Sequence, residues 1–369
     1  PPPVRSAGPP PRLASAKRRE VLLAHPAVQA WSRLNPARVV PERITPAKFK
    51  ANRARSSLTV YRLEGVGEGG AAVIAKRCTP GDGLIERTVY ERILPHVRLP
   101  GPYFYGAVPE ESDDPAKDAC WLFIGEIYGE KYDPLRADHR AAAARWLGVL
   151  HTEARSAVDG ADLREAGPGR YREQMHATRD LIRGAADNPA FTADDLAFLD
   201  GLLARFDQLD EQWDRLEDAC TGLPATLVHG DFNGKNVRVQ ESPQGPRLVV
   251  FDWEDAGRGV PCVDLAQVVG PSCRIAAMPD LPTYWSTVRD RWPTCRKVDI
   301  ERLATCGTVF RALAVLAWDA HHLVHPWANA FLATLQMYEV ELADALGRLG
   351  WARRPVAVSP AAALGEPAG

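Results

Sequence analysis

A short polar loop within residues 227–239 limits the possible folds of this sequence more than any other segment. Its sequence, LVHGDFNGKNVRV, has apolar residues on both sides of a turn rich in Gly, Asp and Asn, which predicts a loop between two short extended segments. Asp231 and Asn236 are five residues apart across this turn. A carboxylate there can accept the proton of a hydroxyl nucleophile, and an amide oxygen can bind a divalent metal. We therefore predict that both residues serve one catalytic site.

A second motif, VVFDWED, follows closely in the chain. It reads as a hydrophobic strand that ends at Asp252, sixteen residues after Asn236, and it places a hard carboxylate ligand at the strand end. Residues 242–246, SPQGP, supply a turn between the two motifs, so we expect a β-hairpin. Glu254 could reach the same metal through a water molecule. The alternative is a surface turn followed by a capping Asp, which would require two metal-competent loops to coincide.

The motif pair HGDFNGKN and FDWED resembles the aminoglycoside phosphotransferase family, the small-molecule branch of the kinase-like fold. The order of elements agrees over about residues 38 to 350, and the loop pair is the specific part. The resemblance implies transfer of the γ-phosphoryl group of ATP or GTP to a hydroxyl group. In that reaction Asp231 would act as the base, Asn236 and Asp252 would hold Mg²⁺, and His229 would support the loop.

The same resemblance implies an α+β fold with two lobes like those of protein kinases. An antiparallel sheet with one helix would form the N-terminal lobe, and the C-terminal lobe would be mainly helical. Residues 1–13 are rich in Pro and carry no periodicity, so we expect the start of the chain to be disordered. The expected parts are an N-terminal extension (1–37, partly disordered), a nucleotide-binding lobe (38–128), a catalytic and substrate-binding lobe (129–358) and a flexible tail (359–369).

The expected phosphate-binding lysine is Lys76, which ends the strand-like segment VIAK. This segment resembles the kinase strand whose Lys pairs with the α- and β-phosphates, whereas a strand-end Lys in solvent is the alternative. The following helix offers Glu86 and Glu91 as partners for this Lys. Glu86 shares a face with the apolar residues three, four and seven positions later, so we expect Glu86 to hold Lys76.

The adenine site is expected at the segment CWLFIGEIYGE, residues 120–130. It resembles the strand and hinge of the family. This resemblance implies that backbone groups of Gly125 and Ile127 meet the adenine edge, with Glu126 between them.

The expected phosphate-covering loop is KANRARSS, residues 50–57, where Ser56 and Ser57 would supply hydroxyl and backbone donors. The glycine-rich turn at residues 65–70 is a weaker candidate because it directly precedes the strand of Lys76. A solvated basic turn is an equal alternative for residues 50–57.

Three features after residue 128 need an interpretation. The segment LGVLHTE resembles a helix of the family, which implies that His151 is a packing and hydrogen-bonding residue. Residues 257–266 resemble another family segment, which implies that Asp264 supports the catalytic loop without touching substrate. The acidic stretch 194–218 fits a solvated helical face, or a wall that binds a cationic, amine-bearing substrate. The histidines of residues 321–325 fit an aromatic packing corner better than a metal site.

Composition narrows the class of partner. A net charge of −2 argues against nucleic acid and against an anionic membrane. No run looks long and apolar enough to cross a bilayer, and the first residues lack a signal-peptide pattern. Seven scattered cysteines without a Cys-x-x-Cys pair favour reduced thiols. We therefore expect a cytoplasmic protein, and the sequence carries no signal for its oligomeric state.

Taken together, these patterns predict an ATP- or GTP-dependent O-phosphotransferase that requires Mg²⁺. The expected acceptor is an antibiotic or another natural product, for resistance or for biosynthesis. A kinase for a metabolite such as choline, a sugar or homoserine would share every motif above. A ligand-binding protein without transfer activity is the third interpretation, which the intact set of predicted base, metal ligands and phosphate Lys disfavours.

Overall fold

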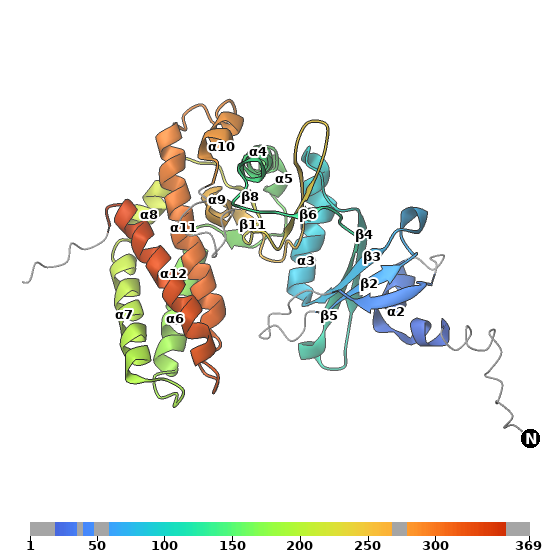
Figure 1. Cartoon of the computed structure of the whole chain (residues 1–369), viewed down its shortest axis with the longest axis horizontal. Helices are drawn as coiled ribbons and strands as arrows, with labels where there is room; N and C mark the ends of the chain where they lie inside the picture. Colours follow the sequence, from blue (N-terminus) through green and yellow to red (C-terminus); the bar gives the residue numbers. More distant parts are fainter. Residues whose placement is uncertain (1–18, 35–39, 48–58, 268–278, 352–369) are drawn as a thin grey trace, which may run out of the picture. The chain divides into compact units, whose positions relative to one another are not determined.

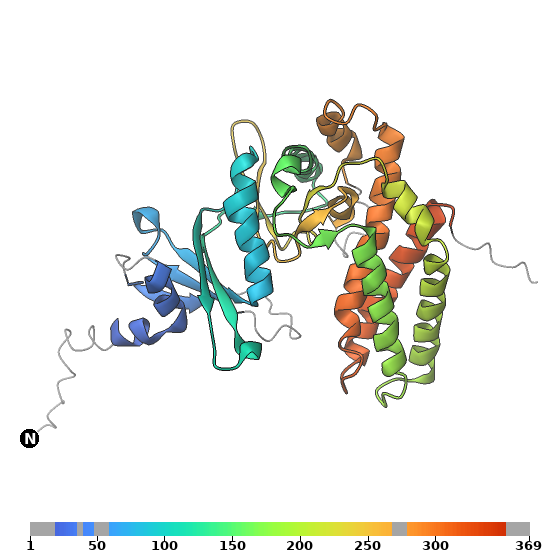
Figure 2. The ribbon, with the colours of Figure 1, turned by 180° about the vertical axis from the view of Figure 1, so that it is seen from behind.

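The computed structural model describes residues 19–34, 40–47, 59–267 and 279–351 (Figure 1; Figure 2 shows it from behind). The predicted phosphate-covering loop, with Ser56 and Ser57, lies outside the described residues.

The chain forms two compact units. One comprises Pro1–Gly167 and Gly222–Ile300, and the other comprises Pro168–Thr221 and Glu301–Gly369. The expected lobe boundary near residue 128 falls inside the first unit, which therefore contains both the N-terminal sheet and the predicted catalytic loop.

A five-stranded antiparallel sheet opens the first unit, as the sequence predicts. The strand order is β1-β2-β3-β5-β4. Both faces of this sheet are covered, because Trp121 and Phe123 pack on α2 while the alternating Cys120 and Leu122 face the side of α3. The elements are α2 (Pro26–Leu34), β1 (Arg43–Pro46), β2 (Thr59–Glu64), β3 (Val73–Cys78), α3 (Pro80–Thr88), β4 (Phe104–Glu110) and β5 (Ala119–Gly125).

Helix α3 lies very close to the sheet. It begins at Pro80, with the Thr79 side chain accepting a hydrogen bond from the Asp82 amide at its N-terminus, and it continues as a π-helical turn (η2, Val89–Ile93) and a 3-10 turn (η3, Leu94–His96). A Cβ atom on Gly83 would lie 2.5 Å from the Cβ atom of Cys120. The absence of a side chain at Gly83 therefore allows the close approach that brings Glu86 over the sheet.

Short strands complete the first unit and carry the predicted loops. The expected hairpin is confirmed, since β9 pairs with β10 in the register Val237↔Val250 and β6 adds a third strand to it. A second small sheet has the order β7-β11-β8. These elements are β6 (Glu130–Lys131), α4 (Ala137–Glu153), α5 (Arg155–Val158), β7 (Glu165–Ala166), β8 (Thr226–Val228), β9 (Val237–Gln240), β10 (Arg247–Val250), β11 (Gly257–Gly259), α9 (Cys262–Gln267) and α10 (Leu281–Val288).

The second unit is helical. Figures 1 and 2 show its long helices side by side, and the stacked rings of Tyr171 and Phe310 (4.6 Å between centroids) belong to its core. Its helices are α6 (Pro168–Gly184), α7 (Ala193–Asp210), α8 (Trp213–Cys220), α11 (Lys297–Ala320), of which the part from Glu301 belongs here, and α12 (Asn329–Arg348).

Part of the acidic stretch 194–218 is used inside this unit. Asp210 accepts a hydrogen bond from Arg172 (2.9 Å) and lies 3.1 Å from His176, both on α6. Burial alone would raise the pKa of Asp210, but these hydrogen bonds lower it. Asp207 likewise pairs with Arg179 of α6 at 3.0 Å. These contacts favour a structural interpretation of the stretch over an acidic wall.

Helix α11 corrects one expectation from composition. It is long and apolar enough to cross a membrane, whereas the sequence analysis expected no such segment. However, 72% of its apolar window is buried inside the protein, which is the pattern of a core helix.

The histidines near the end of α11 pack against aromatic rings. His322 stacks on Phe331 at 4.0 Å between ring centroids, and His325 stacks on Trp327 at 4.7 Å. No group of three potential metal ligands includes them within the described part of the chain. The packing interpretation is therefore favoured.

Candidate active site

The predicted catalytic loop connects β8 to β9 and holds the Asp231 carboxylate from both sides. Its Oδ1 atom accepts a hydrogen bond from the Asn233 side-chain amide (2.6 Å), and its Oδ2 atom accepts one from the Asn236 amide (3.0 Å). Because the nitrogen of Asn236 faces Asp231, its side-chain oxygen is the atom that can turn to a cation. Asp231 is thus oriented by two neutral amides.

Asn233 is a functional candidate that the sequence analysis missed. Its side-chain oxygen also accepts a hydrogen bond from the backbone N–H of Lys235 (2.8 Å), which closes a tight turn inside the loop. An Asn two residues after the Asp is a visible signal for such a turn. The structure gives Lys235 no comparable side-chain role, and its side chain is exposed.

His229 connects the two predicted loops. Its Nδ1 atom accepts the backbone N–H of Asp231 (3.3 Å), so the ring proton is on Nε2, which lies 3.1 Å from the carbonyl oxygen of Phe251. The imidazole is completely buried, and burial lowers its pKa. A neutral His229 therefore fixes the position of the residue just before Asp252.

Asp264 holds the backbone of the same loop. It accepts hydrogen bonds from the backbone N–H groups of His229 (2.8 Å) and Gly230 (2.9 Å), and it lies 3.2 Å from Nε2 of His151. The other ring nitrogen of His151 lies 2.9 Å from the hydroxyl group of Tyr284. Asp264 therefore contacts the loop that the family resemblance implies it supports, and His151 has the packed, hydrogen-bonded position implied for it.

Substitution of Gly230 by Ala should destabilise this loop. Gly230 has a φ of +78°, and an added Cβ atom would lie 2.3 Å from the carbonyl oxygen of Asp255. We expect Gly230→Ala to lower the free energy of unfolding by about 2–4 kcal/mol, because the strained backbone and the clash add. Urea denaturation would measure it. Gly201→Ala is the matched control: this helical position is open, so it should gain about 0.5–1 kcal/mol. Equal stability of Gly230→Ala and the wild type would contradict this geometry.

The buried imidazole also predicts a pH dependence of stability. Since the pKa of His229 lies below 6.5 in the folded protein, the unfolded state binds a proton first as the pH falls, and stability decreases. The slope from this residue approaches about 1.4 kcal/mol per pH unit. Urea denaturation between about pH 5 and 7.5 should therefore show a shallower slope for His229→Gln than for the wild type. Identical slopes would show that His229 titrates as an ordinary histidine.

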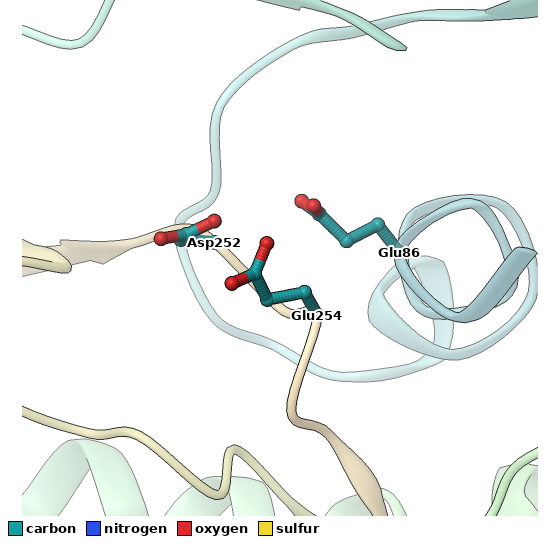
Figure 3. A group of neighbouring side chains, drawn as sticks. All are labelled: Glu86, Asp252 and Glu254. Carbon is teal, nitrogen blue, oxygen red and sulfur yellow. The ribbon is translucent and has the colours of Figure 1, made fainter. Parts of the chain in front are cut away.

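The carboxylates of Glu86, Asp252 and Glu254 lie close together in the same unit (Figure 3), and all three contact Lys76. The Lys76 ammonium lies 2.5 Å from Glu86 and 2.9 Å from Glu254, and it also contacts Asp252. One ligand oxygen from each carboxylate lies within 4.8 Å of the others. The predicted contact between Lys76 and Glu86 is therefore present, and Glu254 contacts Lys76 directly.

This cluster is electrostatically strained. Burial alone would lower the pKa of the Lys76 ammonium, but the three surrounding carboxylates raise it well above its ordinary value. Burial raises the pKa of Glu86 to about 7. Asp252 has a φ of 69°, and no other non-glycine residue among the described ones has a positive φ. The cluster has more carboxylates than cations, and one of the carboxylates is on a residue with an unusual backbone conformation. Both features are typical of a functional site, and the charge excess favours a further cation.

The oxygen ligands present fit Mg²⁺. The backbone N–H of Phe251 donates to the carbonyl oxygen of Asn236 (3.1 Å), which places Asn236 beside Asp252 across the hairpin. Carboxylate and amide oxygens are the ligands that Mg²⁺ prefers. With one ammonium against three carboxylates, a divalent cation would balance the remaining negative charge.

The predicted hinge is only partly available to a nucleotide. The N–H of Gly125 donates to the Tyr103 carbonyl (2.7 Å), and the N–H of Glu126 donates to the Ala72 carbonyl (3.1 Å). The Glu126 carboxylate is bound by Arg62 at 2.6 Å, which lowers the pKa of Glu126. A nucleotide would therefore have to use other hinge groups, such as the backbone N–H of Ile127.

Comparison with known protein families gives one match. The profile described as the phosphotransferase enzyme family matches residues 48–297. No curated protein sequence matches the chain.

Several solved structures of small-molecule kinases share the fold. An aminopropanol kinase associated with a microcompartment is 14% identical, with a TM-score of 0.58 over 91% of this chain and 98% of that one. A choline kinase from Cryptosporidium parvum is 12% identical (TM-score 0.55, 92% and 99%). A spectinomycin phosphotransferase, solved with ADP and spectinomycin, is 11% identical (TM-score 0.55, 85% and 93%). The predicted kinase-like α+β fold is confirmed.

Proposed function

The chain belongs to the phosphotransferase enzyme family, and we propose that it transfers the γ-phosphoryl group of ATP or GTP to a hydroxyl group of a small molecule. The observation that supports this most is the meeting of two loops. Asp231 is oriented for proton transfer on one loop, and Asp252 on the other touches the Lys76–Glu86 pair. Base, phosphate-binding group and metal ligands then belong to one site.

Asp231 would accept the proton of the acceptor hydroxyl at one of its carboxylate oxygens. The hydroxyl oxygen then forms a bond to the γ-phosphorus, and the bond to the bridging oxygen of the nucleotide breaks. Asn233 and Asn236 would keep the carboxylate pointing at the nucleophile. Their neutral amides leave its charge available for the proton.

Lys76 would bind the phosphates of the nucleotide while Glu86 holds it in position. Asn236 and Asp252 would hold Mg²⁺, and Glu254 is close enough to be a further ligand. When bound, Mg²⁺ supplies positive charge that offsets the charge of the phosphate oxygens. We propose that the backbone of Ile127 binds the edge of the adenine ring. The carbonyl group of Gly125 and the backbone of Glu126 would lie nearby.

For the acceptor we propose an antibiotic or other natural product that carries a hydroxyl group and is not a polycation. The pairing of Asp207 and Asp210 with basic residues of α6 supports this limit, because these carboxylates are already neutralised. The structurally similar enzymes include a spectinomycin phosphotransferase and two kinases of amino alcohols. A metabolite kinase is therefore the second candidate.

A panel of acceptors tests the proposal. Nucleotide consumption would be followed with Mg²⁺ and ATP or GTP against neutral antibiotics, polycationic aminoglycosides and small amino alcohols. Mass spectrometry of each acceptor would show the addition of one phosphoryl group. Turnover with a neutral natural product supports the proposal, and turnover with amino alcohols alone would favour the metabolite kinase. Nucleotide binding without turnover on any acceptor would favour a binding protein.

A further inference from the structure

The carboxylates of the metal-competent cluster come from two distant segments of the chain. Glu86 projects from α3, whereas Asp252 and Glu254 project from the loop after β10 (Figure 3). Their clustering within 4.8 Å requires that α3 and this loop keep a fixed separation. Lys76 connects them, but in the proposed function Lys76 also binds phosphate. A link that does not depend on Lys76 would keep the carboxylates in place during the reaction.

Arg164 provides such a link. Its Nη2 atom donates to the main-chain carbonyl oxygen of Glu254 at 2.7 Å and lies 3.5 Å from Oδ1 of Asp82. Asp82 is in the first turn of α3, one turn before Glu86, and its Oδ2 atom accepts the hydroxyl of Thr79 at 2.8 Å. One guanidinium therefore touches both segments that supply the carboxylates.

The backbone that carries Arg164 is itself well fixed. The carbonyl oxygen of Arg164 accepts the backbone N–H of Arg258 (2.9 Å), next to the pairing of β7 with β11. A Cβ atom on Gly257 would lie 2.6 Å from this carbonyl, so the two backbones are in close contact. The Arg164 side chain thus extends from an anchored segment and not from a free loop.

We propose that Arg164 is a positioning residue that sets the spacing between α3 and the loop of Asp252 and Glu254, and thereby the affinity for the divalent cation. This inference rests on the proposed function, because it assumes that the cluster binds a metal with nucleotide. The side chains of Arg164 and Asp82 are 34% and 24% exposed, so solvent screens their ion pair. The effect is therefore mainly geometric, through the rigid fork of the guanidinium.

The test measures metal binding apart from turnover. Mn²⁺ in place of Mg²⁺, with a non-hydrolysable ATP or GTP analogue, would be titrated and followed by electron paramagnetic resonance. We expect Arg164→Ala to weaken Mn²⁺ binding about tenfold, the lower end for loss of a residue that orients metal ligands. Affinity for the analogue without metal should stay the same. Arg164→Lys, which keeps the charge, should give an intermediate loss.

Arg258→Ala is the matched control. Its guanidinium lies on the neighbouring strand, 3.5 Å from Asp159 and 3.7 Å from Glu165, and it is 39% exposed. The Arg258→Ala variant should therefore have the same Mn²⁺ affinity as the wild type. If Arg164→Ala does not fold, Asp82→Ala removes the side chain at the other end of the link and should weaken Mn²⁺ binding in the same direction.

The two proposals can fail separately. Equal Mn²⁺ affinity in the wild type and in the folded variants at positions 164 and 82 would overturn the role of Arg164 alone. Tight Mn²⁺ binding without phosphoryl transfer would overturn the proposed function and leave the role of Arg164 to be decided by the titration. A wild type that binds no Mn²⁺ with nucleotide would overturn both.

Discussion

The Asp231→Asn variant is expected to lose about 10²–10⁴-fold in kcat, because an amide cannot accept the proton of the acceptor hydroxyl. The loss should appear in kcat with little change in the KM for nucleotide, since Asp231 is held by Asn233 and Asn236 and not by the Lys76–Glu86 hydrogen bond that would position the phosphate-binding group. Steady-state kinetics with the acceptor identified by the panel would measure it.

Two comparisons make this result specific to the base. Asp231 is only partly buried and Asn has nearly the same shape, but the new NH2 group would face one of the two side-chain amides that donate to Asp231, so we expect the free energy of unfolding to fall by about 1–3 kcal/mol. Asp218→Asn makes the same change at an exposed position of α8 and should leave kcat unaltered. Full activity in Asp231→Asn would show that another group accepts the proton.

Lys76→Met is expected to reduce both stability and activity. Glu86 is 2% exposed, and loss of the ammonium leaves its carboxylate beside Asp252 and Glu254 without a cation. Breaking such a buried pair costs about 3–5 kcal/mol. We expect the lower end, about 3 kcal/mol, because Glu86 already has a raised pKa and can bind a proton. Phosphoryl transfer should fall below detection together with nucleotide affinity.

The direction in which the stability loss of Lys76→Met changes with pH shows whether Glu86 causes it. In Lys76→Met the folded protein would hold a proton on Glu86 that the unfolded chain releases above its ordinary pKa of 4.5. This contribution to stability is present at low pH and is lost as the pH rises through the folded pKa, so the loss of stability relative to the wild type should be smaller at about pH 5.5 than at about pH 7.5. Urea denaturation at both values would measure it.

Two further variants separate stability from function. The double variant Lys76→Met/Glu86→Gln should recover most of the lost stability, because position 86 then no longer carries a buried carboxylate without its ammonium partner. It should stay inactive. Arg77→Met removes a charge from the next residue of β3, whose pair with Glu110 is partly exposed, and should cost less than about 1 kcal/mol. A double variant no more stable than Lys76→Met would contradict the buried-charge explanation.

Sequence patterns predicted the parts of this site that local chemistry determines. The turn residues of 229–236 and the apolar strands on both sides give the β8–β9 loop, and the confirmed hairpin follows from the same pattern. The enzyme class, a small-molecule phosphotransferase, is confirmed by the family match. The roles of individual residues stay predictions, which the variants above test.

Packing determines the features that sequence patterns did not predict. Glu254 and Lys76 are 178 residues apart, and their contact depends on how the hairpin meets the N-terminal sheet. The contact of Arg164 with Glu254 spans 90 residues and leaves no periodic signal in the sequence. The expectation that no segment is long and apolar enough to cross a membrane was wrong at α11 for a related reason. A core helix that is mostly covered by protein can be as apolar as a membrane span.

The most direct measurement follows the γ-phosphoryl group itself. Purified protein would be incubated with Mg²⁺, γ-labelled ATP or GTP and each acceptor, and the label would be located in nucleotide, inorganic phosphate or acceptor. We predict a labelled phosphate ester of a hydroxyl-bearing natural product with the wild type, and its loss with Asp231→Asn. Label that stays in the nucleotide or appears only as inorganic phosphate with every acceptor, although the nucleotide binds, would contradict the proposed phosphotransferase.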